Sequence, residues 1–150
     1  MSLNGDATKI PIASDEDVVP ARARGRAMAG EIGFSRTDST LIATAISEVA
    51  RNILTHAGCG EIMLAPSVDD RRCGLMVEAR DSGPGIPDVD AALREGYGTG
   101  DGLGLGLPGV SRIMDEFEIE TAVGRGTRVQ MTKWCESNGL ERTRTAFPTR

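Results

Sequence analysis

Hydrophobic residues recur with a helical period in the first third of this 150-residue chain. The clearest stripe predicts a helix that Thr37 or Asp38 caps and Ala57-Gly58 ends. Its apolar members are Leu41, Ile42, Ala45, Ile46, Val49, Ile53 and Leu54. An earlier helix is predicted from Ser14, with Asp17 completing a capping-box pattern, to Gly33. Its apolar face is patchier, and its members are Val18, Val19, Ala23, Met28 and Ile32.

Alternation with a period of two predicts strands on both sides of these helices. A short strand at residues 8–12 contains Pro11, which suggests the edge of a sheet. Two hairpins follow, each with a polar or glycine-rich turn. The first pairs residues 61–68 with 74–80, and the second pairs residues 118–123 with 127–134.

Two helical segments are expected between the hairpins. A short one lies near residues 89–93, and a second begins at Pro108. The second carries one apolar face, made by Val110, Ile113, Met114 and Phe117. Helices interleaved with hairpins predict an α/β (α+β) sandwich with a mixed, mostly antiparallel sheet and helices packed on one face. Residues 1–135 would form this domain, and residues 136–150 a polar, loose tail.

Composition narrows the partners and the compartment. The net charge is −5, and no basic cluster is interleaved with aromatic residues, so nucleic acid is not an expected partner. No segment reaches membrane-spanning length, and the N-terminus lacks a targeting signal. The three cysteines, Cys59, Cys73 and Cys135, have no CxxC spacing and indicate reduced thiols. We therefore expect a cytoplasmic protein without a membrane partner.

Glycine occupies seven of the fourteen positions from Gly96 to Gly109. Such a segment is costly to order, and the approach of its backbone suits phosphate, so it predicts a loop that closes on a ligand. Residues 104–109 match the dinucleotide fingerprint GxGxxG. That motif needs a buried strand before it and an acidic residue after a second parallel strand, and both are missing here. A Walker A motif is also absent.

Three further patterns accompany the glycine-rich segment. Glu48 and Asn52 lie one helical turn apart, in a row with Thr44 and His56 that borders the apolar stripe, where polar groups are half-buried. Asp81-x-Gly83-x-Gly85 follows a predicted strand. Gly124-x-Gly126-Thr127 separates two others. The single histidine, His56, has no partner at triad or metal spacing and is interpreted as a polar residue that ends a helix.

In this order, the four patterns resemble the GHKL (Bergerat) ATP-binding domain. Within that fold the chain resembles the anti-sigma-factor serine/threonine kinases, most closely the RsbT type of switch kinase. The closer resemblance is carried by residues 44–53, 81–88 and 102–117, and it extends from about Ile10 to Trp134.

The resemblance implies ATP and Mg²⁺ as cofactors. Asp81 would accept a hydrogen bond from the adenine amino group, and Asn52 would coordinate the metal ion. Glu48 would act as the general base. The adenine pocket would be completed by Gly83, Gly85, Ile86 and Thr127. The lid that holds the phosphates would contain Gly102, Leu103, Gly104, Leu105, Gly106 and Leu107.

The leading functional hypothesis is a serine/threonine kinase of a bacterial partner-switching, stressosome-type stress response. By resemblance it would phosphorylate a STAS-domain antagonist and, when released, bind and activate a PPM-type phosphatase. The alternative is an RsbW-type anti-sigma factor, which sequesters a sigma factor and phosphorylates its anti-anti-sigma partner. A third possibility, an ATPase module of a larger machine, is disfavoured because the chain lacks a transducer domain and a catalytic lysine that such a domain would supply.

Overall fold

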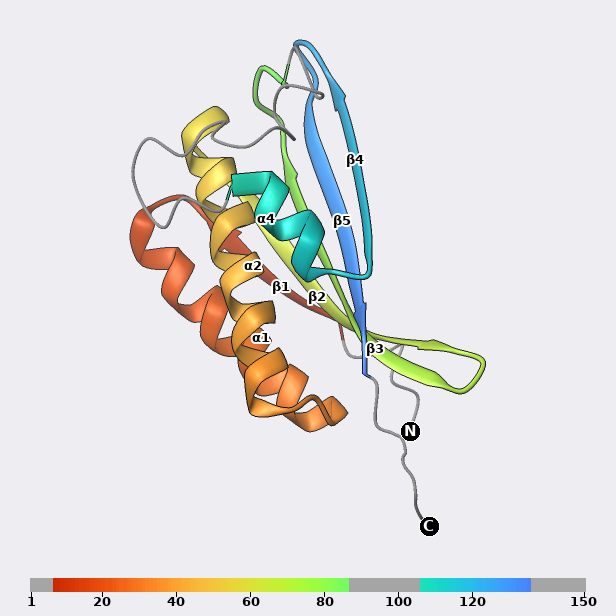
Figure 1. The fold of residues 1–150 in the computed structure, drawn as a ribbon. Coiled ribbons are helices and arrows are strands. Elements are labelled where there is room, and N and C mark those ends of the chain that lie inside the picture. Colours follow the sequence, from red (N-terminus) through yellow and green to blue (C-terminus); the bar gives the residue numbers. More distant parts are fainter. Residues whose placement is uncertain (1–6, 87–105, 136–150) are drawn as a thin grey trace.

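The computed structural model describes residues 7–86 and 106–135, which form a five-stranded sheet with helices on one face (Figure 1). The strands are β1 (Thr8–Ile12), β2 (Gly60–Asp69), β3 (Arg72–Asp81), β4 (Glu116–Ala122) and β5 (Gly126–Trp134). Their order in the sheet is β1-β2-β3-β5-β4, and all four pairings are antiparallel. The predicted sandwich is confirmed.

The helical layer consists of η2 (Asp15–Asp17), α1 (Val18–Ile32), α2 (Arg36–His56) and α4 (Gly106–Ile113). The core lies between this layer and the sheet, where α2 contributes Ile46 and Val49 against Leu64, Val77 and Met131. Alternate residues of each strand therefore face the helices, and the intervening residues form the uncovered face of the sheet. Within the described ranges, no helix combines the length and apolar character needed to cross a bilayer.

Several boundaries follow the predicted signals. Asp17 accepts hydrogen bonds from the backbone N–H groups of Ala13 (2.8 Å) and Ser14 (3.1 Å), as a capping box requires. Gly33 ends α1 with a φ of 122°, a conformation that glycine adopts without strain. Pro11 lies on the edge strand β1, where its missing N–H costs no ladder hydrogen bond.

Other predictions in the two long helices are wrong. Ser35, rather than Thr37 or Asp38, caps α2, because its hydroxyl accepts a hydrogen bond from the Asp38 N–H (3.1 Å). Leu41 is 37% exposed and lies outside the buried stripe. In α1, Val19 and Ala23 are exposed. The residues that α1 buries are Val18, Ala21, Gly25, Met28 and Ala29.

The helix predicted to begin at Pro108 has different ends in the structure. Helix α4 begins two residues before Pro108 and ends at Ile113, so Met114 and Phe117 are not part of it, and Phe117 lies in β4. Asp115 causes this change: its N–H donates to the Thr132 carbonyl (2.9 Å), and its carboxylate accepts from the Trp134 N–H (2.7 Å). These bonds draw the chain into the sheet. The short helix predicted near residues 89–93 lies outside the described residues.

Candidate active site

Asp81 is fixed at the end of β3, opposite Thr127 of β5. It alternates with the buried residues Val77 and Ala79, so its side chain belongs to the helix-facing side of the sheet and is 8% exposed. One carboxylate oxygen, Oδ1, accepts hydrogen bonds from the N–H groups of Gly83 (2.9 Å) and Thr127 (3.2 Å). Two backbone donors on one oxygen hold the carboxylate in a single orientation.

Thr121 ties the loop after Asp81 to the β4–β5 hairpin. Its hydroxyl accepts from the Ile86 N–H (2.8 Å), donates to the Gly126 carbonyl (3.1 Å) and contacts the Thr127 hydroxyl (2.9 Å). Since a hydroxyl has one proton, Thr127 is the donor in the last pair. The Gly124 N–H also donates to the Pro84 carbonyl (2.7 Å).

Gly83 and Gly85 are required by close packing. A Cβ at Gly83 would lie 2.5 Å from the Ala57 Cβ, at the end of α2. A Cβ at Gly85 would lie 2.5 Å from the Ala122 carbonyl oxygen, and Gly85 has a φ of 84°. Side chains at either position would push the loop away from α2 or from the hairpin. The two glycines therefore hold the Asp81 loop between these elements.

Glu48 lies on α2 nine residues before Ala57. Helix α2 packs beside α4 (Figure 1). The Glu48 side chain is 10% exposed. One oxygen, Oε1, accepts from the Gly106 N–H (3.3 Å) at the first residue of α4. The partial positive charge of a helix N-terminus favours a carboxylate there. Asn52 follows one turn later and is half-buried, so the amide and the carboxylate occupy one side of α2.

The second oxygen of Glu48 is not satisfied. Oε2 lies 3.8 Å from the Arg51 Nη1, which is too long for a hydrogen bond. Both atoms are buried, and neither has a hydrogen-bond partner among residues 7–86 and 106–135. Buried polar atoms of this kind are rare, and a catalytic role is one explanation for them.

Helix α2 connects the two ends of the site. Gly83 packs against Ala57 at its C-terminus, and Glu48 lies nine residues earlier, about 13 Å along the axis. An extended nucleotide placed along α2 can thus have its base near Asp81 and its last phosphate near Glu48. This distance along the helix axis follows from the sequence spacing of Glu48 and Ala57, and the packing of Gly83 on Ala57 links it to the Asp81 loop.

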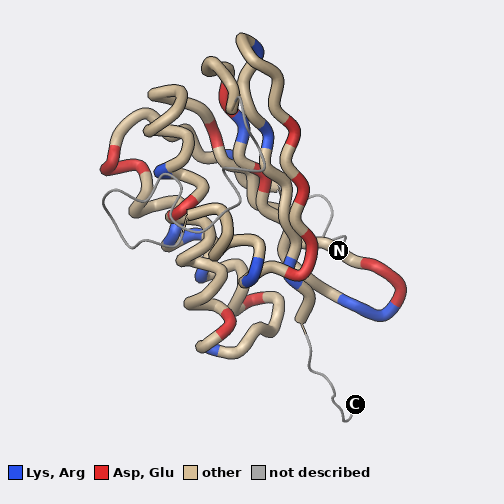
Figure 2. Tube along the Cα trace, turned by 45° about the horizontal axis from the view of Figure 1, so that its top comes forward, with Lys and Arg blue, Asp and Glu red and all other residues tan. Residues whose placement is uncertain are grey.

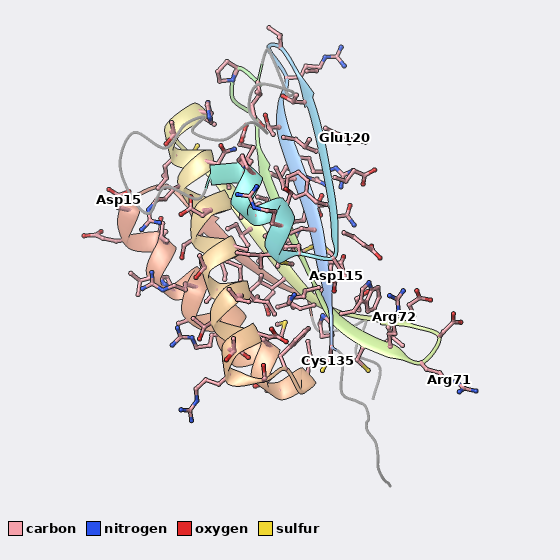
Figure 3. All side chains as sticks on the ribbon, viewed as in Figure 1. Asp15, Arg71, Arg72, Asp115, Glu120 and Cys135 are labelled. Carbon is pink, nitrogen blue, oxygen red and sulfur yellow. The ribbon has the colours of Figure 1, made fainter. Side chains whose placement is uncertain are left out.

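Two hollows flank the Asp81 end, with volumes of about 370 and 290 Å³. Both are lined by Arg80, Asp81 and Ser82. The smaller hollow also contacts Ala57 and Gly83 at the C-terminal end of α2, and the larger extends past Thr127 to Glu120 and Arg128 on the uncovered face of the sheet. Figure 3 labels Glu120 on β4, away from α1 and α2.

The uncovered face carries an ion-pair network. Glu78 accepts from Arg80 (2.8 Å) and Arg128 (3.3 Å), and Arg128 also pairs with Glu120 (3.1 Å). The Glu120 hydrogen bond raises the pKa of Arg128 above its ordinary value, so this guanidinium stays charged. Figure 2 shows acidic and basic positions interspersed along these strands. The network balances charges across β3, β5 and β4.

The structure places most of the predicted site residues in two groups. One group lies at the corner after β3 and contains Asp81, Gly83, Gly85, Ile86 and Thr127. In the other group Glu48 contacts Gly106, and the neighbouring Leu107 is buried. Gly102, Leu103, Gly104 and Leu105 lie outside the described residues. Sequence reasoning missed Thr121, although its position opposite Thr127 across a glycine turn was an available signal.

The described side chains could supply only part of the coordination shell of a Mg²⁺ ion. Within residues 7–86 and 106–135, no group of three or more His, Cys, Asp or Glu side chains could hold a metal ion. Mg²⁺ prefers oxygen ligands and usually keeps waters and substrate phosphates in addition to one or two protein groups. The half-buried Asn52 amide, as a single protein ligand, fits that requirement.

The comparisons with known proteins agree with this geometry. The model of the histidine kinase-like ATPase domain matches residues 12–133. The chain belongs to this GHKL family. It is 46% identical over 129 residues to the serine/threonine-protein kinase RsbT of Bacillus subtilis (strain 168), covering 86% of this chain and 97% of the relative.

More distant relatives place the chain in the same group. An anti-sigma F factor of Caldanaerobacter subterraneus subsp. tengcongensis is 32% identical over 124 residues, covering 79% of this chain and 85% of the relative. The mycobacterial sensor histidine kinase MprB shares the fold, with a TM-score of 0.51 and 19% identity, covering 85% of this chain and 97% of the other. The predicted anti-sigma-factor serine/threonine kinase family is confirmed.

Proposed function

We propose that this protein transfers the γ-phosphate of ATP to a serine or threonine hydroxyl of a STAS-domain antagonist, in a cytoplasmic partner-switching pathway. The observation that carries this proposal is the buried, unsatisfied Oε2 of Glu48. A carboxylate oxygen with free lone pairs beside a helix N-terminus can accept a proton next to bound phosphate. The 46% identity to a serine/threonine-protein kinase supports the reaction class.

The Asp81 corner is proposed to bind adenine. Because Oδ1 is held by two backbone donors, the carboxylate presents its other oxygen, Oδ2, in a fixed direction. That oxygen would accept from the adenine amino group. Gly83, Gly85 and Ile86 would allow the base to approach the backbone, and Thr127 would close the pocket.

The phosphates are proposed to lie at the N-terminus of α4, with the lid of residues 102–107 around them. There the helix dipole favours negative charge, and the Gly106 N–H that now donates to Glu48 could donate to a phosphate instead. Asn52 would hold Mg²⁺, which would supply positive charge against the negative charge of the phosphates. The protein's own task is then to position the two reactants.

Glu48 is proposed to act as the general base. Oε2 accepts the proton of the acceptor hydroxyl as that oxygen bonds to the γ-phosphorus. The bond from the γ-phosphorus to the β-γ bridging oxygen breaks at the same time, and ADP leaves. The reaction yields a phosphoserine or phosphothreonine and a protonated Glu48, which returns its proton to solvent.

The test is transfer of radiolabelled γ-phosphate to STAS-domain proteins encoded in the same genome, assayed one at a time with Mg²⁺-ATP. We expect one of them to become labelled on serine or threonine. Binding of ATP without transfer to any of them would contradict the proposal.

The anti-sigma F relatives support a second candidate. In this version the protein also sequesters a sigma factor, and phosphorylation of its antagonist controls release. A pull-down separates the two: recovery of a sigma subunit favours the anti-sigma factor. Recovery of a PPM-type phosphatase, whose activity rises on binding, favours the RsbT-like switch kinase.

A further inference from the structure

We propose that Arg51 is a positioning residue that holds the Glu48 carboxylate in place for proton transfer. The inference rests on the proposed function and assigns a role to a side chain outside the predicted site residues. Arg51 follows Glu48 by three positions on α2, so both lie on the same side of the helix.

Burial separates this pair from an ordinary ion pair on a helix surface. An exposed pair at this spacing contributes little because water screens both charges. Here the Glu48 side chain is 10% exposed, and although the Arg51 side chain is 41% exposed, its Nη1 is buried and faces Oε2 at 3.8 Å. Two buried, unsatisfied atoms of opposite charge therefore lie slightly beyond hydrogen-bond distance from each other.

The contact on the other Glu48 oxygen, Oε1, explains why a second residue is needed to hold the carboxylate. Oε1 is bonded to the Gly106 N–H at the start of α4 (3.3 Å). This is the N–H group at which the phosphates are proposed to bind, so nucleotide and Glu48 compete for it. When phosphate takes the Gly106 N–H, the guanidinium of Arg51 is the described contact that remains on Glu48. A small movement then converts the 3.8 Å approach into a hydrogen bond.

Four variants test this role in the transfer assay: Arg51→Ala, Arg51→Lys, Glu48→Gln and the double variant Glu48→Gln/Arg51→Ala. Arg51→Ala should lower kcat about tenfold and leave ATP affinity within about twofold. Arg51→Lys should restore part of the rate, since it keeps the charge but not the planar guanidinium. In the Glu48→Gln background, Arg51→Ala should cause no further loss. Arg71→Ala, in the exposed β2–β3 turn labelled in Figure 3, is the control and should match wild type.

The split between kcat and ATP affinity separates positioning from loss of structure. A variant that is merely damaged would lose ATP affinity and transfer rate alike, and Arg51→Lys would not restore them. Equal kcat in Arg51→Ala and wild type, or an equal further loss in the Glu48→Gln background, would overturn the inference.

A readout independent of transfer keeps the inference testable even if the proposed function is wrong. The ¹⁵N guanidinium resonance of Arg51 is recorded by NMR in wild type, Glu48→Gln and Asp81→Asn. We expect it to shift in Glu48→Gln and to remain in place in Asp81→Asn. An unchanged resonance in Glu48→Gln would refute the pairing of Arg51 with Glu48, whereas absence of transfer by wild type with a normal shift would refute only the kinase assignment.

Discussion

The Asp81 corner and the Glu48 end of the site differ in how completely their polar atoms are paired. At the Asp81 corner, Oδ1 accepts two backbone hydrogen bonds, and the Thr121 and Thr127 hydroxyls bond to each other. At the Glu48 end, one oxygen has a single long hydrogen bond, and the other has none within the described part of the chain. Under the proposed assignment, the difference means that the Asp81 corner is formed before nucleotide arrives, whereas the Glu48 end is completed by phosphate and acceptor.

The largest expected effect comes from disturbing the preformed corner. Asp81→Asn keeps the size of the side chain but replaces one oxygen with an amide donor, which would face the adenine amino group. ATP affinity should fall about a hundredfold or more, because a hydrogen bond to a charged group is lost and two donors are opposed. Isothermal titration calorimetry measures this loss.

Thermal unfolding provides the control for Asp81→Asn. The Asn oxygen can still accept from the Gly83 and Thr127 N–H groups, so the Tm should change by only a few degrees. ATP binding at wild-type affinity would show that the carboxylate does not read the base.

An intermediate effect is expected at Gly85. A Cβ there requires both a φ of 84° and displacement of the Ala122 carbonyl. Gly85→Ala should lower the free energy of unfolding by about 2 kcal/mol or more, and the Tm by about 5 °C. Gly30→Ala is the matched control: a Cβ at this position in α1 meets open space, and the variant should be more stable by about 0.5–1 kcal/mol.

Differential scanning calorimetry checks both glycine variants. If Gly85→Ala and Gly30→Ala had the same Tm, the Asp81 loop would not be held against the hairpin as described.

The smallest effect is expected at Thr121. Thr121→Val removes the hydroxyl that joins the Ile86 N–H to the hairpin and should cost about 1–2 kcal/mol of unfolding free energy. Thr121→Ser keeps the hydroxyl and should stay closer to wild type. Urea denaturation compares the two. Equal losses in both variants would mean that the methyl group, rather than the hydroxyl, stabilises this corner.

The same contrast explains how much of the molecule could be predicted from the sequence. The strands, the long helix α2 and the half-buried row containing Glu48 and Asn52 follow from periodicity, because each depends on residues close in the chain. The cap at Ser35 and the early end of α4 before Asp115 could not be predicted from periodicity, since each depends on a specific hydrogen bond. In particular, Asp115 bonds to β5, nearly twenty residues later.

The candidate site shows the same division. Asp81, Gly83 and Gly85 form a local motif, so sequence alone indicated them. Thr121 joins that motif only because the β4–β5 register places it opposite Thr127. Arg51 is three residues from Glu48, yet the significance of their contact comes from the burial of the two facing atoms, which spacing alone does not reveal.

The central claim is that Glu48 serves transfer and not nucleotide binding. The most direct measurement loads Glu48→Gln and wild type with equal amounts of radiolabelled Mg²⁺-ATP, confirms occupancy in the same samples, and follows a single turnover to the STAS-domain acceptor. The account predicts equal occupancy and a rate of phosphoryl transfer reduced by about 10²–10⁴ in Glu48→Gln. Transfer at the wild-type rate from fully loaded Glu48→Gln would contradict it.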